Sequence, residues 1–168
     1  QSLMVQVIKD PLGTKGARLS TQISFAGRYL VYLPQESHIG ISQKIEGEEE
    51  REQLRQKLHR LMPEDATGGF IVRTMAETAE DAEMQADIDY LRRLWSSIQS
   101  RGNCEAPCLL YQDLDLSLRV LRDFVNRDTS RILIDSRETY QRMAEFAQNY
   151  TAAVLDKLQH YGADRPLF

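Results

Sequence analysis

The chain has 168 residues, of which 42% are hydrophobic and 27% charged, and its formal net charge is −4. This composition is that of a folded globular protein and argues against intrinsic disorder, and no apolar stretch approaches the roughly 20 residues that cross a bilayer. Two cysteines, Cys104 and Cys108, have no second cysteine pair and no histidine nearby, so the sequence supports neither a zinc knuckle nor a disulfide framework. We therefore expect a cytoplasmic protein with reduced thiols.

The charges are distributed unevenly along the chain. Residues 1–44 contain five Lys or Arg and two acidic residues, a balance of +3, which leaves −7 for the remaining residues. A basic segment in an otherwise acidic chain indicates contact with a polyanion. A chance cluster of charges on a solvated face is the alternative explanation.

The first part of the chain has the alternation of apolar and polar residues that is typical of β-strands. We expect strands in residues 3–7 and 17–34, on either side of the turn sequence "DPLGTKG", and another short strand in residues 38–45. The turn lacks the G-x-x-x-x-G-K-[ST] spacing of a nucleotide-binding loop, so a glycine-rich β-turn is expected. Lys9 and Lys15 flank this turn and could hold a phosphodiester backbone as point charges.

Helical spacing begins after residue 45. Residues 46–62 start with glutamates and end with basic residues, as a helix dipole favours, and a short strand, "GGFIVRT", follows at 68–74. A longer helix is expected from a cap at Thr78 to the residue before Gly102. Its apolar stripe is more typical of a core-facing helix than of a seam with a partner helix. The stripe consists of Met84, Ile88, Leu91, Trp95 and Ile98.

The C-terminal part is expected to be a small α/β unit that begins after the segment "RGNCEAP" at 101–107. The pattern predicts a strand at 108–112, a helix at 114–126, a strand at 130–136 and a helix at 137–150. Two strands leave an apolar sheet face uncovered, so we expect this part to depend on further strands elsewhere in a longer protein.

Three aspartates in this part are candidate metal ligands. Asp113 and Asp115 follow a predicted strand, and Asp135 follows another, an arrangement that could serve the two-metal hydrolysis of a phosphodiester. Each also lies at or near a predicted helix start, where an N-cap is the alternative. The histidines have no ligand or acid–base spacing with these acids, so the sequence contains no demonstrable catalytic set.

Arg73 and Thr74 are unusual because they end an otherwise apolar strand. An arginine fork binds phosphate through two parallel charge-assisted hydrogen bonds, and an adjacent hydroxyl can donate a third. A salt bridge between Arg73 and a surface glutamate is the competing explanation.

Several segments in order and spacing resemble the ribonuclease E and ribonuclease G family. They are "VQVIKDPLGTKGARLSTQISFAGRYLVYLP", "GISQKIEG", "GGFIVRT", "LRDF" and "RILIDS", and "VIKDPLGTKGARL" is most similar to the ribonuclease G branch. The resemblance covers essentially the whole chain, and its specificity rests on several separate motifs in register.

The resemblance implies an α+β fold with parts of three domains. Residues 1–21 would be the C-terminal end of an OB-fold RNA-binding domain, and residues 22–117 would be a 5′-monophosphate sensor domain. Residues 118–168 would be part of a ribonuclease H-like α/β domain. The chain would then be a piece of a longer protein.

The resemblance also assigns roles to individual positions. Four residues would form the pocket for the RNA 5′-phosphate: Gly27, Val31, Arg73 and Thr74. Lys9 and Lys15 would contact the RNA backbone near the scissile bond. Gln43 and Lys44 stand where ribonuclease E has two arginines, so the contact of the first of those arginines is in doubt.

The resemblance implies that the whole protein is a magnesium-dependent endoribonuclease of rRNA processing and mRNA decay. Its substrate would be single-stranded RNA with a 5′-monophosphate, and the protein would be a homo-oligomer. The catalytic aspartates that hold magnesium would lie beyond Phe168. This chain by itself is therefore expected to have no catalytic residues, to need no cofactor and to be inactive. The alternative is a non-catalytic protein-interaction scaffold in which Arg73 makes only a salt bridge.

Overall fold

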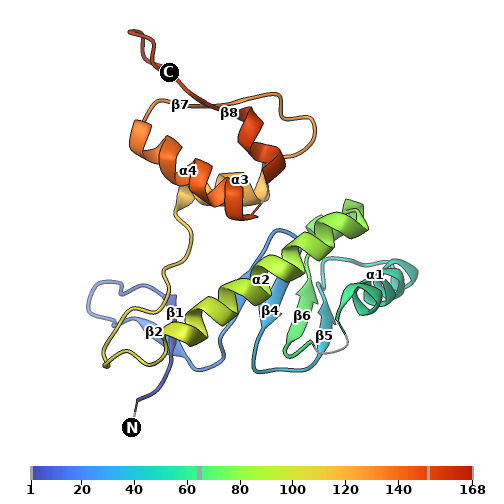
Figure 1. The fold of residues 1–168 in the computed structure, drawn as a ribbon. Helices are drawn as coiled ribbons and strands as arrows, with labels where there is room; N and C mark the ends of the chain where they lie inside the picture. The colour runs from blue at the N-terminus through green and yellow to red at the C-terminus, as the bar shows by residue number, and fades with distance from the viewer. Residues whose placement is uncertain (1, 64–65, 151, 168) are drawn as a thin grey trace. The chain divides into compact units, whose positions relative to one another are not determined.

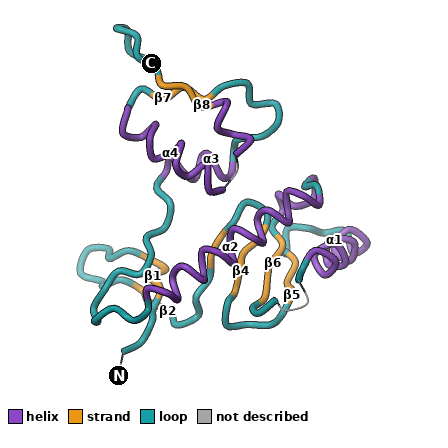
Figure 2. The backbone as a smooth tube through the Cα atoms, in the orientation of Figure 1, coloured by secondary structure: helices purple, strands orange, loops and turns teal. Residues whose placement is uncertain are grey.

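The computed structural model describes residues 2–63, 66–150 and 152–167, and the chain divides into two compact units, Gln1–Leu110 and Tyr111–Phe168. Helices and strands occur in both units, which confirms the expected mixed α+β class (Figures 1 and 2). The division between the units falls between Leu110 and Tyr111 in the sequence. The assignment of 1–21, 22–117 and 118–168 to three family domains stays a prediction. None of the described helices is both long and apolar enough to span a membrane.

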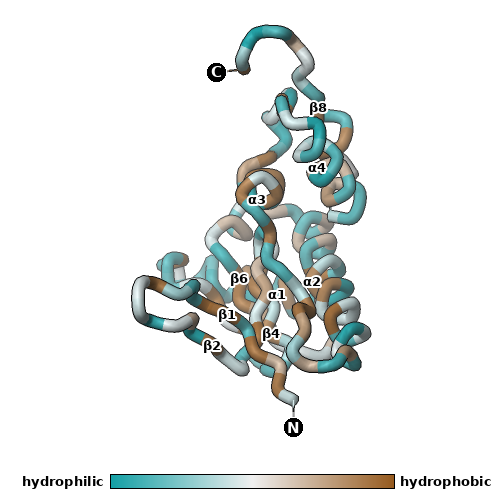
Figure 3. Tube along the Cα trace, turned by 90° about the vertical axis from the view of Figure 1, so that its left-hand side faces the viewer, coloured by the Kyte–Doolittle hydropathy of each residue, from teal (hydrophilic) through white to brown (hydrophobic). Residues whose placement is uncertain are grey.

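A β-hairpin opens the first unit. Strands β1 (Gln6–Lys9) and β2 (Arg18–Ser20) pair antiparallel, and two backbone hydrogen bonds of 3.0 Å between Leu12 and Lys15 close the turn. Gly13 in this turn has a φ of 58°, a left-handed conformation that favours glycine. The predicted glycine-rich turn is therefore confirmed. The first strand lies later than the expected 3–7, and the hairpin carries apolar residues on an exposed surface (Figure 3).

A four-stranded sheet forms the centre of the first unit, in the order β3-β4-β6-β5. Strands β3, β4 and β6 are antiparallel neighbours, whereas β5 runs parallel to β6. A parallel pair needs a crossover connection, and helix α1 (Glu48–Leu61) supplies it between β5 and β6. The strands are β3 (Phe25–Ala26), β4 (Leu30–Leu33), β5 (Ile39–Ile41) and β6 (Gly69–Val72).

Helix α2 (Asp81–Arg101) crosses the sheet and packs against β4, and α1 packs against β5 and α2 (Figure 1). The predicted stripe is confirmed as core, because four of its members are buried and Trp95 packs against Phe25 with ring centroids 5.9 Å apart. The cap predicted at Thr78 is wrong. A capping box between Glu80 and Glu83 starts the helix, and Thr78 ends the preceding 3-10 helix, η1 (Thr74–Thr78).

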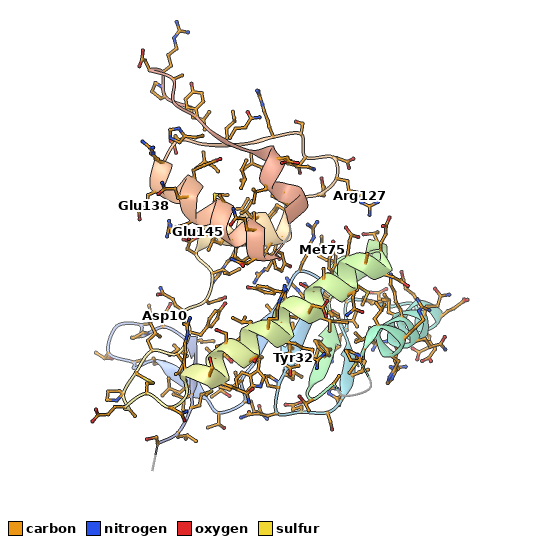
Figure 4. All side chains as sticks on the ribbon, viewed as in Figure 1. Asp10, Tyr32, Met75, Arg127, Glu138 and Glu145 are labelled. Carbon is orange, nitrogen blue, oxygen red and sulfur yellow. A yellow bond between two sulfur atoms is a disulfide. The ribbon has the colours of Figure 1, made fainter. Side chains whose placement is uncertain are left out.

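The glycine pair that begins "GGFIVRT" has a steric origin. Gly68 has a φ of 92°, and a Cβ atom there would lie 2.5 Å from the ring of Tyr32. Tyr32 is fully buried beside Phe70, with ring centroids 4.9 Å apart, and its hydroxyl donates a 2.9 Å hydrogen bond to the Thr67 carbonyl (Figure 4). The glycine therefore lets the chain enter β6 directly above a core aromatic ring.

Among its described residues, the second unit has three helical elements and a two-stranded parallel sheet of β7 (Ile132–Ile134) and β8 (Leu158–His160). The predicted helices at 114–126 and 137–150 correspond to α3 (Leu116–Asp123) and α4 (Arg137–Tyr150), and η2 (Ala152–Lys157) leads to β8. All of these elements contribute buried residues to the core of this unit. Its buried members are Leu121, Val125, Ile134, Met143, Ala147, Val154 and Leu158.

The strand predicted at 108–112 is wrong. The segment has no strand assignment, and Leu109 is 78% exposed. An apolar run becomes a strand only when a partner strand pairs with it, and this run pairs with no strand among the described residues. Cys104 and Cys108, on either side of the cis Ala106–Pro107 bond, are joined as a disulfide with a Cα–Cα distance of 6.5 Å. The expectation of two reduced thiols is therefore not met by the structure.

Candidate functional site

Arg73 lies directly after β6, against the turn that joins β3 to β4. Its backbone N–H donates a 2.8 Å hydrogen bond to the Tyr29 carbonyl, and its guanidinium Nη1 donates to the Gly27 carbonyl. The structure thus brings together two of the four predicted pocket residues, although 46 positions separate them in the chain. Arg73 is half-buried, so part of its side chain remains accessible to solvent.

Thr74 is the first residue of η1, for which Arg73 is the N-cap. The Ala76 N–H donates a 3.0 Å hydrogen bond to the Arg73 carbonyl, which fixes the change of direction after the strand. Thr74 is half-buried, and among the described residues its hydroxyl makes no hydrogen bond. The next residue, Met75, is 40% exposed (Figure 4). The predicted polar pair therefore lies at a partly open end of the sheet.

Val31 is the fourth predicted pocket residue. It belongs to β4, where it pairs with Ala26 on one side and with Ile71 on the other. Ile71 precedes Arg73 by two positions, so Val31 lies close to the same end of the sheet. It is half-buried, in contrast to its fully buried neighbours Leu30 and Tyr32, and therefore occupies the less buried face.

A fifth residue, Asp87 of α2, holds the turn against which Arg73 lies. One carboxylate oxygen, Oδ1, accepts the Arg28 N–H at 3.0 Å, and Oδ2 accepts the N–H groups of Tyr29 and Leu30 at 2.9 and 3.0 Å. Asp87 is only 2% exposed. The sequence interpretation missed it, although one signal was available: Asp87 falls on the same helical face as Met84 and Leu91.

The Tyr29 side chain in this turn is buried. Burial raises the pKa of Tyr29 above its ordinary value, the Arg28 guanidinium opposes this shift, and Glu83 adds to it. The Arg28 Cζ lies 5.3 Å from the centroid of the Tyr29 ring. The turn therefore carries a cation above an aromatic ring, beside the buried Asp87 carboxylate.

Lys9 and Lys15 lie on the β1–β2 hairpin, and both are exposed. Lys9 ends β1 opposite Arg18, and Lys15 belongs to the turn that Leu12 closes. The hairpin therefore presents several cations to solvent on an element separate from the sheet that carries Arg73. Their assignment to an RNA backbone stays a prediction.

The candidate acidic residues have structural partners. Asp113 pairs with Arg119 at 3.0 Å, and Asp115 pairs with Arg142 at 2.8 Å. Asp115 also caps α3, because its Oδ1 accepts the Leu118 N–H at 3.0 Å. Hydrogen bonds from the Ser117 hydroxyl and then from Leu118 lower the pKa of Asp115. The N-cap alternative is thus confirmed for Asp115.

Three other positions that were selected from the sequence are also described by the structure. Ser136, beside Asp135, accepts the Thr139 N–H at 3.2 Å and so caps the start of α4. Gln43 and Lys44 are exposed in the loop after β5, and Arg51 of α1 binds the carbonyls of that loop. Across the described residues, no group of three or more His, Cys, Asp or Glu side chains could hold a metal ion.

Comparison with known proteins addresses the resemblance directly. The Ribonuclease E/G family matches residues 24–168. The chain therefore belongs to the ribonuclease E/G family. Over its whole length it is 47% identical to Ribonuclease G of Escherichia coli (strain K12) and 40% identical to Ribonuclease G of Haemophilus influenzae. It is 38% identical over 152 residues, 90% of the chain, to Ribonuclease E of Nostoc sp..

These family members are much longer than the chain. The chain spans 34% of the length of both ribonuclease G relatives and 22% of the length of the Nostoc ribonuclease E. The predicted family and the particular likeness to ribonuclease G are confirmed. The roles of Gly27, Val31, Arg73 and Thr74 in phosphate binding stay predictions.

Proposed function

We propose that this chain is the RNA-binding and 5′-monophosphate-sensing part of a single-strand-specific endoribonuclease of RNA processing and decay. The family match supports a ribonuclease. The observation that supports the sensing role is the position of Arg73, which is anchored to the Gly27 carbonyl at a partly open end of the sheet, directly before the Thr74 hydroxyl.

The chemistry of this site suits a terminal phosphate. A guanidinium has five N–H donors in a planar fork, so it can donate to the Gly27 carbonyl and to a phosphate at the same time. Charge-assisted hydrogen bonds from the fork, together with one from the Thr74 hydroxyl, would hold a doubly charged 5′-monophosphate. A 5′-triphosphate adds charge and bulk for which this small set has no matching donors, and this mismatch gives the specificity.

Lys9 and Lys15 add a contact that does not depend on the RNA end. Exposed lysines on a hairpin attract the phosphodiester backbone through counterion release, irrespective of sequence. An RNA held at its 5′-end and along its backbone has a raised effective concentration at the site of cleavage. The sensor would thus favour cleavage of strands with a 5′-monophosphate.

Cleavage itself belongs to the remainder of the protein. Asp113 and Asp115 pair with Arg119 and Arg142, and Asp115 caps α3, so both carboxylates have structural roles. Magnesium-dependent hydrolysis is therefore assigned to a part outside this chain, which we expect to be inactive alone. Cytoplasmic location and a homo-oligomeric parent protein belong to the same proposal.

Binding of short single-stranded RNAs tests the proposal. Three RNAs that differ only in a 5′-monophosphate, 5′-hydroxyl or 5′-triphosphate carry a fluorophore at the 3′-end, and anisotropy gives the Kd of each. We expect the monophosphate to bind most tightly, and Arg73→Ala to weaken its binding by about 10- to 100-fold, the value of one or two charge-assisted hydrogen bonds. Equal affinities for the three ends, unchanged by Arg73→Ala, would instead support the protein-interaction scaffold.

A further inference from the structure

Asp87 is a buried carboxylate within the apolar face of α2, and core packing does not explain it. Burying a carboxylate is costly unless hydrogen bonds compensate for the lost water. Three backbone N–H groups, from Arg28, Tyr29 and Leu30, provide this compensation at 2.9 to 3.0 Å.

The turn between β3 and β4 has an unusual hydrogen-bond pattern. In an ordinary β-turn, the carbonyl of the first residue accepts the N–H of the fourth. Here the first residue is Gly27 and the fourth is Leu30, but the Leu30 N–H donates to Asp87 and the Gly27 carbonyl accepts from Arg73. The Gly27 N–H still donates a 2.8 Å hydrogen bond to the Leu30 carbonyl, but the second bond that could close the turn, from the Leu30 N–H to the Gly27 carbonyl, is replaced by bonds to side chains of opposite charge.

This exchange of partners has a consequence for Arg73. A turn closed by Leu30 would engage the Gly27 carbonyl within the turn. Because Asp87 binds the Leu30 N–H, that carbonyl faces the guanidinium and can orient it. The Tyr29 carbonyl of the same turn binds the Arg73 backbone N–H at 2.8 Å. Both the main chain and the side chain of Arg73 thus depend on the conformation that Asp87 stabilises.

Gly27 shows how closely the carboxylate approaches the turn. A Cβ atom on Gly27 would lie 2.4 Å from both Oδ1 and Oδ2 of Asp87, which no real contact allows. The backbone of Gly27 is not in the left-handed region, so conformational freedom does not explain this glycine. Residue 27 must be small because the Asp87 carboxylate lies directly against it. The position of Asp87 therefore depends on Gly27.

We propose that Asp87 is a positioning residue for the 5′-phosphate site. By binding the N–H groups of residues 28–30 it holds the turn in the form that leaves the Gly27 carbonyl to orient the Arg73 guanidinium. This inference rests on the proposed function of Arg73. It adds to that proposal a residue that does not contact the phosphate and that acts through another side chain.

The test compares two isosteric substitutions on the same helix. Asp87→Asn keeps one acceptor oxygen but places an amide N–H₂ against backbone N–H groups, which disrupts the pattern without a cavity. Asp89→Asn, on the exposed face of α2, is the matched control. For each variant, anisotropy gives the ratio of Kd values for 5′-hydroxyl and 5′-monophosphate RNA, and circular dichroism monitors the fold.

We expect Asp87→Asn to reduce that ratio by about tenfold, as misalignment of one charge-assisted hydrogen bond would, while the Kd for 5′-hydroxyl RNA stays within about twofold. Asp89→Asn should leave both values unchanged. In the double variant with Arg73→Ala, the Asp87 substitution should have no further effect on the ratio, because it acts through Arg73. An additional, independent loss in the double variant would overturn the inference.

The outcomes separate the inference from the proposed function. If the unchanged protein shows no preference for the monophosphate, the proposed function fails. If the preference exists and Arg73→Ala removes it, but folded Asp87→Asn retains it, only the role of Asp87 fails.

If Asp87→Asn does not fold, a measurement on the unchanged protein tests the inference instead. In ¹⁵N NMR spectra, 5′-monophosphate RNA should shift the backbone amides of residues 28–30 together with the Arg73 Nε–H, and 5′-hydroxyl RNA should not. A response of Arg73 without one from residues 28–30 would also overturn the inference.

Discussion

Gly27→Ala provides a sharp test of the arrangement at the turn, because the structure gives the distance on which the effect depends. The added Cβ would lie 2.4 Å from both carboxylate oxygens of Asp87. Forcing a methyl group into a packed site costs about 1–3 kcal/mol. Displacing the carboxylate from its N–H partners adds a similar amount, because a hydrogen bond to a charged group contributes about 1.5–3 kcal/mol. We therefore expect a loss of about 2.5–6 kcal/mol in the free energy of unfolding.

Trp95 makes it possible to measure this loss of stability in the first unit, which contains Gly27. It is the sole tryptophan of the chain, it lies in α2 and it packs against Phe25 of β3, so its fluorescence reports the contact between the helix and the sheet. Urea titration followed by this signal gives the free energy of unfolding. Gly16→Ala is the control, because a Cβ there meets nothing within 4 Å, and its effect should stay below about 0.5 kcal/mol.

A double-mutant cycle identifies the cause of the loss. In an Asp87→Ala background the carboxylate is absent, so Gly27→Ala should cost no more than about 1 kcal/mol and the two substitutions should be strongly non-additive. If Gly27→Ala costs less than about 0.5 kcal/mol in the unchanged protein, the carboxylate does not lie against Gly27 and the reasoning fails. Full additivity would refute it equally.

Two further predictions concern other parts of the chain. Replacing Lys9 and Lys15 with alanine should weaken binding of all three RNA ends by similar factors and reduce the salt dependence of log Kd by about one per phosphate contact, measured by anisotropy at several salt concentrations. A change restricted to the 5′-monophosphate would contradict this. The pKa of Asp115 is lowered in the folded state, so its contribution to stability is complete above the ordinary carboxyl pKa and is lost as pH falls below about 4. Asp115→Ala should destabilise the second unit by about 1 kcal/mol at pH 7 and by less in acid, as measured by chemical denaturation. An equal effect at both pH values would exclude a role of the Asp115 carboxylate as the helix cap.

The elements with strong periodicity could be predicted from the sequence, and those that depend on distant pairing could not. The stripe on α2 is a local pattern, and it correctly indicated both the helix and its buried face. The apolar run at 108–112 has the composition of a strand but finds no partner among the described residues, whereas Leu158–His160 pairs with β7 despite two polar residues out of three. Composition alone does not determine which of two such segments joins a sheet.

The same limit applies to the candidate site. Arg73 and Thr74 could be selected from the sequence because a polar pair at the end of an apolar strand is visible locally. The position of Asp87 on the apolar face of α2 could indicate burial, but its role could not be predicted, because the N–H groups that it accepts lie 57 to 59 positions away and every residue except proline has such a group. An aspartate on a helix is ordinarily a solvated residue, and only the fold shows that this one is enclosed.

The contact between Arg73 and Gly27 bears on the choice between a structural and a binding role for the guanidinium. A carbonyl partner orients the guanidinium while contributing no opposite charge. The Asp87 carboxylate acts on the same turn through the N–H groups of Arg28 and Leu30. The contact with Gly27 thus fixes one edge of the planar guanidinium fork, and donors fixed in advance are what an anion site requires.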